Sequence, residues 1–508
     1  MQILLFLAIY KVSNVNDLAN IVLLTVDCLR FDRVADSPYS KKFTKNINSL
    51  ANKGVLFYEA VTNSSWTIPS LITLLTSTYP LVHNVLTDHT FKTMRFLNRC
   101  YGKYALVYPL KTRVRILSLP RILHMRKYRG VCVHSSPILS HYRYLTEITK
   151  WFDVIRDAFP HISKGQTITI PEQLKSSLGA IGCHSRFICE AFALLYSQIS
   201  RLLRKSIKPY ADAEKITNEA LFLTKKLKNK IDNNLFVWLH YMDVHPPYIP
   251  PIRYLEDLGW DLREAVTEYY EIQLKISFCP DNITRKDLEL LNTFYNYSVK
   301  YVDECIGYLL DKLEEMSLKL EDTLIILTAD HGELIGEHSA IGHGVLLYDE
   351  LVKVPLIMSG SGLPQGVKIN FQIGFIDLMP TILEILGINA AQTLLGKSRA
   401  YLINEKDNLA SEPVISECIG PETCRFSYRT KDWKYILTIR KKSMIEELYN
   451  IRSDQKEREN LVQMEKDFSK VFREKIIGHI KTAMEYSRIY RERQKLIQRI
   501  QDLKKRTL

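Results

Sequence analysis

Residues 63–80 read NSSWTIPSLITLLTSTYP, a stretch that combines hydroxyl residues with an apolar run. Its apolar residues recur at helical spacing, and Pro69 falls in the first turn, where its missing N–H is not needed. The pattern predicts a helix with Thr67 at its N-cap. A hydroxyl at a helix start faces unpaired backbone N–H groups and the positive end of the helix dipole, so an anionic ester would dock against it. A lone threonine is better explained as a cap, and only its partners elsewhere in the chain favour a nucleophile.

Buried strands are expected on both sides of this helix. Residues 20–26 (NIVLLTV) form a continuous apolar run, which predicts a strand buried on both faces, as in a parallel sheet. Similar runs are found at residues 54–58, 130–140, 235–241, 323–328 and 354–358. A long amphipathic helix is expected at residues 292–316. The alternation of strand and helix predicts an α/β fold, with a doubly wound, mostly parallel central sheet and helices on both faces.

The sequence changes in character after about residue 410. The pattern there predicts short antiparallel strands, and the end of the chain is helical in pattern without any proline. We expect variable insertions in the catalytic domain, the second of them rich in helix and poor in strand. The expected parts are a catalytic domain (18–405) with insertions at about 88–130 and 141–230, a small C-terminal α+β subdomain (411–462) and a basic helical tail (463–508).

The tail holds thirteen Lys and Arg against six Asp and Glu, in a chain whose formal charge is +13. An a/d heptad seam, interrupted by Arg493, is formed by Tyr486, Ile489, Leu496, Ile500 and Leu503. A solvated surface is the simpler interpretation of the charge. The alternative is a homo-oligomer or a contact with an anionic surface. We expect no specific nucleic-acid partner.

The cysteines and the first residues bear on the compartment. Nine cysteines, an odd number, are scattered without metal-ligand spacing, which predicts reduced thiols inside a cell. The start, MQILLFLAIYK, has an apolar run of only about nine residues, too short to span a bilayer and without the basic start of a signal peptide. We therefore expect a soluble protein in the cytoplasm, or one peripheral to a membrane.

Polar side chains follow three of the predicted strands. These strand-end residues are Asp27, Asp243 with His245, and Asp330 with His331. Because open α/β sheets place their sites at the carboxyl ends of the strands, we expect them to converge with Thr67 on one divalent cation. The cation would lower the pKa of the hydroxyl and make it a nucleophile. Any one Asp-His pair after a strand is more often a structural cap, whereas four such points in one chain favour a metal site.

The chain resembles the sulfatase branch of the alkaline-phosphatase-like superfamily. The similarity extends over roughly residues 20–462, in family order. It rests on stretches that include NIVLLTVDCLRFD, VTNSSWTIPSLITLLTSTYPLVHNV, FVWLHYMDVHPPYIPP, TLIILTADHGELIGEHSAIGHG and ELYNIRSDQKERENL. The resemblance implies that the metal is held by Asp27, Thr67, Asp330 and His331. It also implies that His245 and His343 contact the transferred sulfuryl or phosphoryl group or bind a second metal, while His338 is structural or at the rim.

The departures from the sulfatase pattern are equally informative. A sulfatase of this family uses a formylglycine made from the first residue of a Cys/Ser-x-Pro-x-Arg motif. The same window here is TIPSL, from Thr67 to Leu71, and threonine oxidation would give a ketone, so we expect no formylglycine. The doubled Asp of the first motif is Asp27-Cys28, and His331 stands where an Asn is common. Fewer oxygen ligands and one nitrogen favour Mn²⁺ or Zn²⁺, with Mg²⁺ or Ca²⁺ as the alternatives.

Together these features predict a metal-dependent hydrolase or transferase acting on phosphate or sulfate esters, with phosphoryl transfer preferred, as in the phosphodiesterases of the superfamily. Thr67 would attack and form a covalent intermediate. The substrate would be a small-molecule, lipid-linked or glycan ester. One alternative is a true sulfuric ester hydrolase that uses Thr67 directly. The other is a catalytically lapsed scaffold whose basic tail makes the functional contact.

Overall fold

The computed structural model describes most of the chain outside the two predicted insertions. The described residues are 19–34, 37–83, 117–136, 139, 148–158, 208, 210–229, 234–389, 394–403, 411–420, 423–441 and 443–506, with the side chains of the last helix described to residue 489. Residues 84–116 and 159–207, which hold most of the predicted insertions, lie outside this set.

The predicted α/β fold is confirmed by an eight-stranded sheet in the order β10-β2-β9-β6-β1-β5-β3-β4. Neighbouring strands are parallel except at β9, which is antiparallel to both β2 and β6. The strands are β1 (Asn20–Val26), β2 (Gly54–Val61), β3 (Arg129–His134), β4 (Val154–Asp157), β5 (Leu235–Tyr241), β6 (Thr323–Ala329), β9 (Leu356–Ser359) and β10 (Val367–Gly374). The sequence pattern missed β4 and β10, which stand at the two edges of the sheet.

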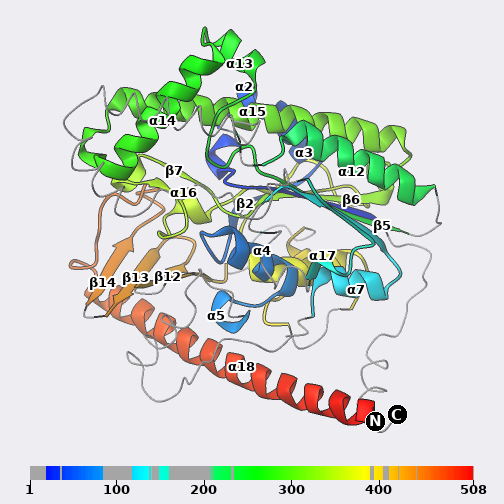
Figure 1. Cartoon of the computed structure of the whole chain (residues 1–508). Helices are drawn as coiled ribbons and strands as arrows, with labels where there is room; N and C mark the ends of the chain where they lie inside the picture. Colours follow the sequence, from blue (N-terminus) through cyan, green and yellow to red (C-terminus); the bar gives the residue numbers. More distant parts are fainter. Residues whose placement is uncertain are drawn as a thin grey trace.

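The sheet is covered by helices on both faces, as a doubly wound fold requires. In Figure 1, α3, α12 and α15 lie above the sheet, and α4, α7 and α17 lie below it. The helices of this domain are α2 (Ser40–Phe43), α3 (Lys45–Asn52), α4 (Thr67–Thr76), α5 (Pro80–His83), α7 (Leu119–Met125), α12 (Ala213–Lys228), α13 (Ile252–Asp257), α14 (Leu262–Phe278), α15 (Arg285–Glu315), α16 (Asp349–Val352) and α17 (Leu378–Ile385). The long predicted helix begins earlier than expected, because Thr284 and Asp287 form a capping box.

The three central strands end at the same level. In β1, Val26 pairs with Tyr241 of β5 on one side and with Ala329 of β6 on the other. All three strands are almost wholly apolar and buried, which the continuous hydrophobic runs predicted. The residues that follow them, Asp27 and Asp330 among them, therefore come together at one edge of the sheet.

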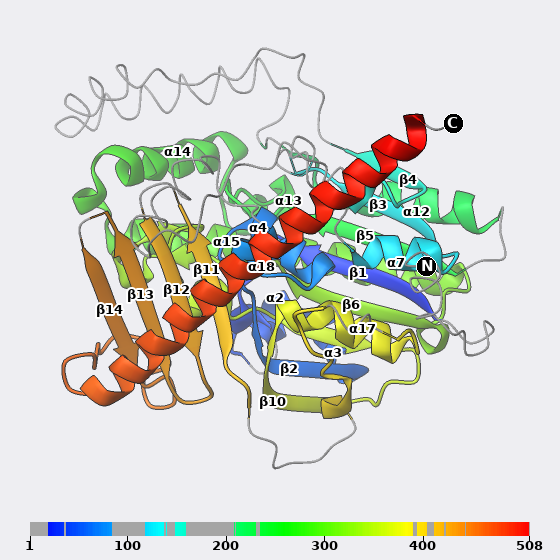
Figure 2. The same cartoon turned by 90° about the horizontal axis from the view of Figure 1, so that it is seen from below.

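A second, four-stranded antiparallel sheet confirms the strands predicted after residue 410. It has the order β11-β12-β13-β14. Its strands are β11 (Val414–Ile419), β12 (Thr423–Arg429), β13 (Lys434–Arg440) and β14 (Met444–Tyr449). The helix α18 (Lys466–Arg506) runs from this sheet past α5 (Figure 2).

The face of α18 that packs on the sheet is not the predicted heptad seam. Phe472, Ile476 and Ile480 are buried in one apolar cluster with side chains of β12 and β13. By contrast, Tyr486 and Ile489 of the seam are each 48% exposed. We therefore propose that the first half of the helix belongs to the same folding unit as the sheet, rather than to a removable tail.

Polar contacts also tie α18 to the helix that follows α4. The Nε2 atom of His479 contacts the Oε1 atom of Glu417 on β11, and the other Glu417 oxygen accepts a hydrogen bond from the backbone N–H of Leu81 in α5 (2.8 Å). The ring of Tyr79 packs edge-on against that of His479, with centroids 4.5 Å apart. Helix α18 thus contacts Tyr79 directly and α5 through Glu417, and both of these follow α4 in the chain.

Ile480→Ala is expected to lower the free energy of unfolding by about 2–5 kcal/mol, because it leaves a cavity between α18 and the sheet. Tyr486→Ala is the matched control on the same helix and should change it by less than about 0.5 kcal/mol. Urea denaturation of the full chain measures both. Equal, small effects for the two variants would contradict the packing of α18.

The cysteines differ in part from expectation. Five of those in the described residues are free and buried: Cys28, Cys132, Cys305, Cys418 and Cys424. Cys279, however, is disulfide-bonded, so the prediction that the thiols are all reduced is wrong for this residue. Within the described part of the chain, no helix has both the length and the apolar character that crossing a membrane requires.

Candidate active site

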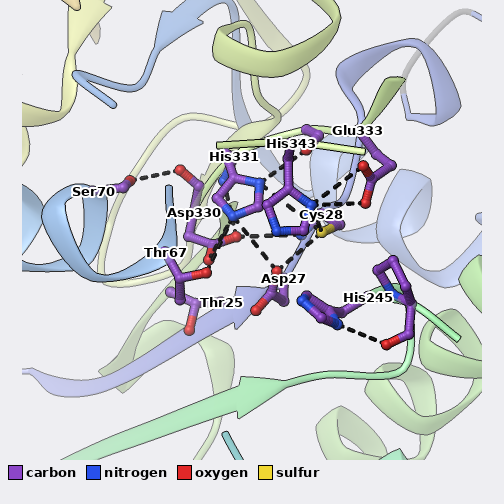
Figure 3. Close-up of polar contacts among 12 residues, drawn as sticks. Thr25, Asp27, Cys28, Thr67, Ser70, His245, Asp330, His331, Glu333 and His343 are labelled. Atoms are coloured by element: carbon purple, nitrogen blue, oxygen red, sulfur yellow. Dashed lines mark hydrogen bonds and ion pairs between the residues drawn. The ribbon is translucent and has the colours of Figure 1, made fainter. Parts of the chain in front are cut away.

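Two buried carboxylates face each other at the ends of β1 and β6 (Figure 3). Asp27 is 1% exposed and Asp330 is fully buried. One oxygen of each is hydrogen-bonded: Asp330 Oδ1 accepts from the backbone N–H of His331 (2.8 Å), and Asp27 Oδ1 accepts from Cys28 Sγ (3.1 Å). The Oδ2 atoms of both residues are buried without a hydrogen-bond partner. Such atoms are costly to bury unless a cation binds them.

The electrostatics of this pair are asymmetric. Burial raises the pKa of Asp27, but the imidazoles of His245, His240 and His331 outweigh it and hold the pKa below its usual range. Burial and the charge of Asp27 together raise the pKa of Asp330. The negative charge of Asp27 therefore disfavours ionisation of Asp330. A bound cation would stabilise both charges.

Thr67 is the first residue of α4, whereas the sequence predicted it as the N-cap, so the helix begins one residue earlier than expected. Trp66, in an extended conformation (φ −134°, ψ 138°), is the N-cap residue, and no side chain caps the helix. The Thr67 hydroxyl therefore does not bond to its own helix; it lies 3.2 Å from the Nε2 atom of His331. Ser70, one turn later, donates a hydrogen bond to the backbone oxygen of Asp330 (2.6 Å) and ties the helix to the end of β6.

Three histidines present the same ring nitrogen to the site. The Nδ1 atom of His331 is 2.9 Å from Gly332 O, and that of His245 is 2.8 Å from Pro246 O. Because these oxygens can only accept, each Nδ1 carries a proton and each Nε2 is free for another partner. The Nδ1 atom of His343 is likewise 3.0 Å from a Glu333 oxygen. The rings are close, with the His343 centroid 4.4 Å from that of His331 and 5.1 Å from that of His245.

Glu333 is a site residue that the sequence did not reveal. Its side chain is completely buried, and Figure 3 shows both of its oxygens turned to His343. Burial lowers the pKa of His343, but the Glu333 carboxylate outweighs this and raises it to about 9. Without a metal at this histidine, the His343 imidazole is therefore a cation at neutral pH, with its Nε2–H available to an anionic group.

The donor atoms form two groups that could each hold a metal ion. The first consists of Asp27, His240 and Asp330, and the second of Cys28, His331 and His343. Within each group the donor atoms lie within 4.8 Å of one another. The first group fits a divalent cation, because its three facing atoms are all buried and unpartnered. His240 was missed from the sequence, although a polar residue one place before the end of the apolar strand LFVWLHY was a signal.

Two candidates lie outside this centre. Asp243 is buried but pairs with Lys208, whose Nζ atom is 2.8 Å from Asp243 Oδ1. His338 stacks on Tyr348, with ring centroids 3.6 Å apart, and its Nε2 atom is 3.2 Å from Glu350. Neither contributes to the two groups of donors around the carboxylates. The structure thus brings together Asp27, Thr67, His245, Asp330, His331 and His343, and adds Cys28, His240 and Glu333.

Comparisons of the sequence with known proteins find sulfatases. The sulfatase family model matches residues 19–388, and the model of the C-terminal region of N-sulphoglucosamine sulphohydrolase matches residues 336–486. Human arylsulfatase K is 30% identical over 203 residues, which is 38% of this chain and 37% of that protein. The aligned part thus spans little more than a third of the curated relative.

Two solved structures show the same fold over nearly their whole length. The phosphonate monoester hydrolase of Agrobacterium radiobacter superposes with a TM-score of 0.59 at 18% identity, covering 93% of this chain and 96% of the other. A second protein, solved in complex with its substrate D-glucosamine-2-N,6-O-disulfate, superposes with a TM-score of 0.60 at 16% identity, covering 93% and 98% of the two chains.

Proposed function

Because this chain belongs to the sulfatase family, within the alkaline-phosphatase-like superfamily, we propose that it is a metal-dependent enzyme that transfers or hydrolyses phosphate or sulfate esters, with phosphoryl transfer preferred. The observation that carries the proposal is the position of the Thr67 hydroxyl. It is 3.2 Å from His331 Nε2, at the first residue of a helix that has no side-chain cap. Two buried carboxylates with unpartnered oxygens lie beside it. Nucleophile, anion-binding helix end and cation site thus coincide.

The metal would be held by Asp27, Asp330, His331 and Thr67. A divalent ion bound there would lower the pKa of the hydroxyl and offset negative charge on the ester oxygens. The donor set, two carboxylates with imidazole nitrogen, favours Mn²⁺ or Zn²⁺ over Ca²⁺, which prefers six to eight oxygens. No formylglycine is required, because the threonine oxygen itself is the nucleophile.

The chain's own groups support a two-step reaction. Without the ion, His331 Nε2 accepts the hydrogen bond of the Thr67 hydroxyl, which orients Oγ1. With the ion bound, this nitrogen would be a ligand, and the hydroxyl would release its proton to water. Oγ1 attacks the phosphorus, the bond from phosphorus to the leaving oxygen breaks, and that oxygen takes up a proton. A water molecule then attacks the same phosphorus and releases phosphate and free Thr67. In a transferase, an acceptor hydroxyl replaces this water.

The anionic group would be held by the end of α4 and by the histidines. The first backbone N–H groups of the helix and its dipole favour negative charge on the equatorial oxygens. The Nε2–H of the His343 cation, oriented by Glu333, is a second donor. The ring of His245 lies beside that of His343, with its Nε2 free, and would contact the transferred group or a second metal.

The residues in the TIPSL window favour phosphorus over sulfur. Leu71, at the place of the arginine of the formylglycine motif, is fully buried in the main apolar core. No guanidinium is therefore supplied from this position. One structural relative is a phosphonate monoester hydrolase, which lends support to a phosphorus ester as substrate. The name of the curated relative, arylsulfatase K, favours the alternative of a sulfuric ester hydrolase that uses Thr67 directly.

Paired aryl esters separate these two functions. With p-nitrophenyl phosphate and p-nitrophenyl sulfate as the matched pair, we expect kcat/KM to be higher for the phosphorus ester by at least about tenfold, which is ~1.4 kcal/mol in the barrier. A phosphodiester of the same phenol extends the comparison. Thr67→Ala protein, prepared identically, gives the background rate. A preference for the sulfate would support the sulfuric ester hydrolase. A folded, metal-free protein without turnover would support the lapsed scaffold.

The natural substrate class follows from the same site. We propose a small-molecule, lipid-linked or glycan ester, which presents one anionic ester group to the end of α4. The relative solved with a sulfated glucosamine shows that a protein with this fold accommodates a sugar ester. We also propose the division into residues 18–405, 411–462 and 463–508, in which the first half of α18 packs on the sheet of the second part. A cytoplasmic location and a contact of α18 with an anionic surface or a second copy stay predictions.

A further inference from the structure

His240 occupies an unusual position for a buried imidazole. It lies on β5, next to β1, and its side chain is 1% exposed. Its Nε2 atom is 3.5 Å from Asp27 Oδ2, and neither atom has a hydrogen-bond partner. Asp330 Oδ2 is the third unpartnered atom of the same group. Two carboxylate oxygens and one ring nitrogen therefore converge, in the interior of the protein, on a point that no protein donor occupies.

The hydrogen bonds of Thr25 favour the tautomer with a free lone pair on Nε2. Trp238 Nε1 donates to Thr25 Oγ1 (3.0 Å), and that hydroxyl donates to Leu239 O (3.2 Å). With its one proton used in this way, Thr25 Oγ1 can only accept from His240 Nδ1, which lies 2.9 Å away. The proton is then on Nδ1, and Nε2 faces the carboxylates as a donor of electrons. This is the arrangement of a metal-bound histidine whose second nitrogen is held by a hydrogen bond.

We infer that His240 is a ligand of the metal ion, together with Asp27 and Asp330, and that its nitrogen supplies the donor lost where Cys28 follows Asp27 in place of a second carboxylate. The inference rests on the metal dependence proposed above. Cys28 does not fill that place itself, because its thiol lies against Asp27 Oδ1 at 3.1 Å and adds no charge there. With His331, the set would hold two carboxylates and two imidazoles, which favours Zn²⁺ or Mn²⁺ and disfavours Ca²⁺. Thr25, one strand away, is the positioning residue for this ligand.

Metal binding to the full chain tests the inference without using activity. Zn²⁺ and Mn²⁺ affinities are measured by competition with a chelator, and the number of bound imidazoles by the ¹⁴N couplings in pulsed EPR of the Mn²⁺ form. His240→Gln should weaken binding by more than about 100-fold and remove one ¹⁴N coupling, since a ligand contributes more than its orienting partner. Thr25→Val keeps the ligand but frees its ring, and should weaken binding about tenfold. His83→Gln, a buried imidazole hydrogen-bonded to Thr73, is the matched control and should change neither quantity.

A change in the preference between metal ions provides a second, independent test of the inference. His240→Asp restores an oxygen ligand and should shift the ratio of Ca²⁺ to Zn²⁺ affinity upward by at least about tenfold. The inference is overturned if His240→Gln binds Mn²⁺ with the affinity and ¹⁴N couplings of the wild type. That result would leave the proposed function intact provided that the wild type binds metal and hydrolyses the aryl phosphate. Failure of the wild type to bind any of these ions would instead overturn the metal dependence itself.

Discussion

Thr67→Ala is expected to lower kcat by about four orders of magnitude or more on the aryl phosphate, because the nucleophile and a metal ligand disappear together. Thr67→Ser should stay within about tenfold of the wild type, since its oxygen can occupy the same place. Recombinant protein should be active as translated, without a maturation partner. Mass spectrometry of enzyme quenched during turnover should find a phosphorylated peptide that contains Thr67.

Thr73→Ala is the matched control for the nucleophile. It removes a hydroxyl from the same helix, where Thr73 bonds to His83 rather than to the site. It should retain the wild-type rate. Thr67→Cys, without an arginine at position 71, should neither be converted to formylglycine nor restore the rate. Wild-type turnover by Thr67→Ala would place the nucleophile elsewhere. Ser70, whose hydroxyl is directed to Asp330 O, would then be less suited to the role than Ser65.

Asp330→Asn is expected to abolish stoichiometric metal binding and to reduce turnover by at least about three orders of magnitude, as loss of a ligand at the strand end requires. The metal-free variant should nevertheless be more stable than the metal-free wild type, by about 1 kcal/mol. The reason is that the neutral amide removes the burial of a charge and its repulsion by Asp27, which together raise the pKa of Asp330. Metal content by mass spectrometry and urea denaturation of both metal-free proteins measure the two effects.

The control for Asp330 is a buried carboxylate far from the metal. Asp303, on α15, accepts hydrogen bonds from the backbone N–H of Ile47 (2.8 Å) and of Asn46 (3.1 Å). Asp303→Asn should lose stability but keep its metal and its rate. Near-normal turnover by Asp330→Asn after metal depletion would show that the pair of carboxylates is not the metal site.

The central strands and their ends were predictable, whereas contacts across the sheet were not. Asp27 and Asp330 stand out because continuous apolar runs stop at them, and the register of β1 and β6 then places them together. Glu333 carries no such local mark, and the mark of His240, a polar residue within an apolar strand, does not show what its ring faces. Glu333 matters only because a turn returns His343 to it, and His240 only because β5 lies beside β1. The partner of Glu333 lies ten residues further along the chain, and Asp27, which His240 faces, follows a different strand, so neither contact shows in the local pattern.

The missed elements have their own physical reasons. β4 is an edge strand of four residues with a largely exposed pattern, so it lacks the apolar run that marked the interior strands. β10 is also at an edge and carries an irregularity between Ile369 and Gln372. In α18 two apolar stripes share one helix, and the sequence alone favoured the stripe that proved partly exposed at Tyr486 and Ile489. The N-cap of α4 is Trp66 and not Thr67, and the Thr67 hydroxyl contacts His331, outside the helix.

The contact between α18 and α5 has a consequence for the order in which the protein is made. The helix that carries Thr67 emerges early in synthesis, but the Glu417 and His479 side chains that contact the segment after it are made more than three hundred residues later. The parallel pairing of β1 with β5 and β6 likewise joins segments more than two hundred residues apart. The packing around α5, directly after α4, is therefore completed only once α18 has been made, and we expect nascent chains halted before α18 to remain inactive.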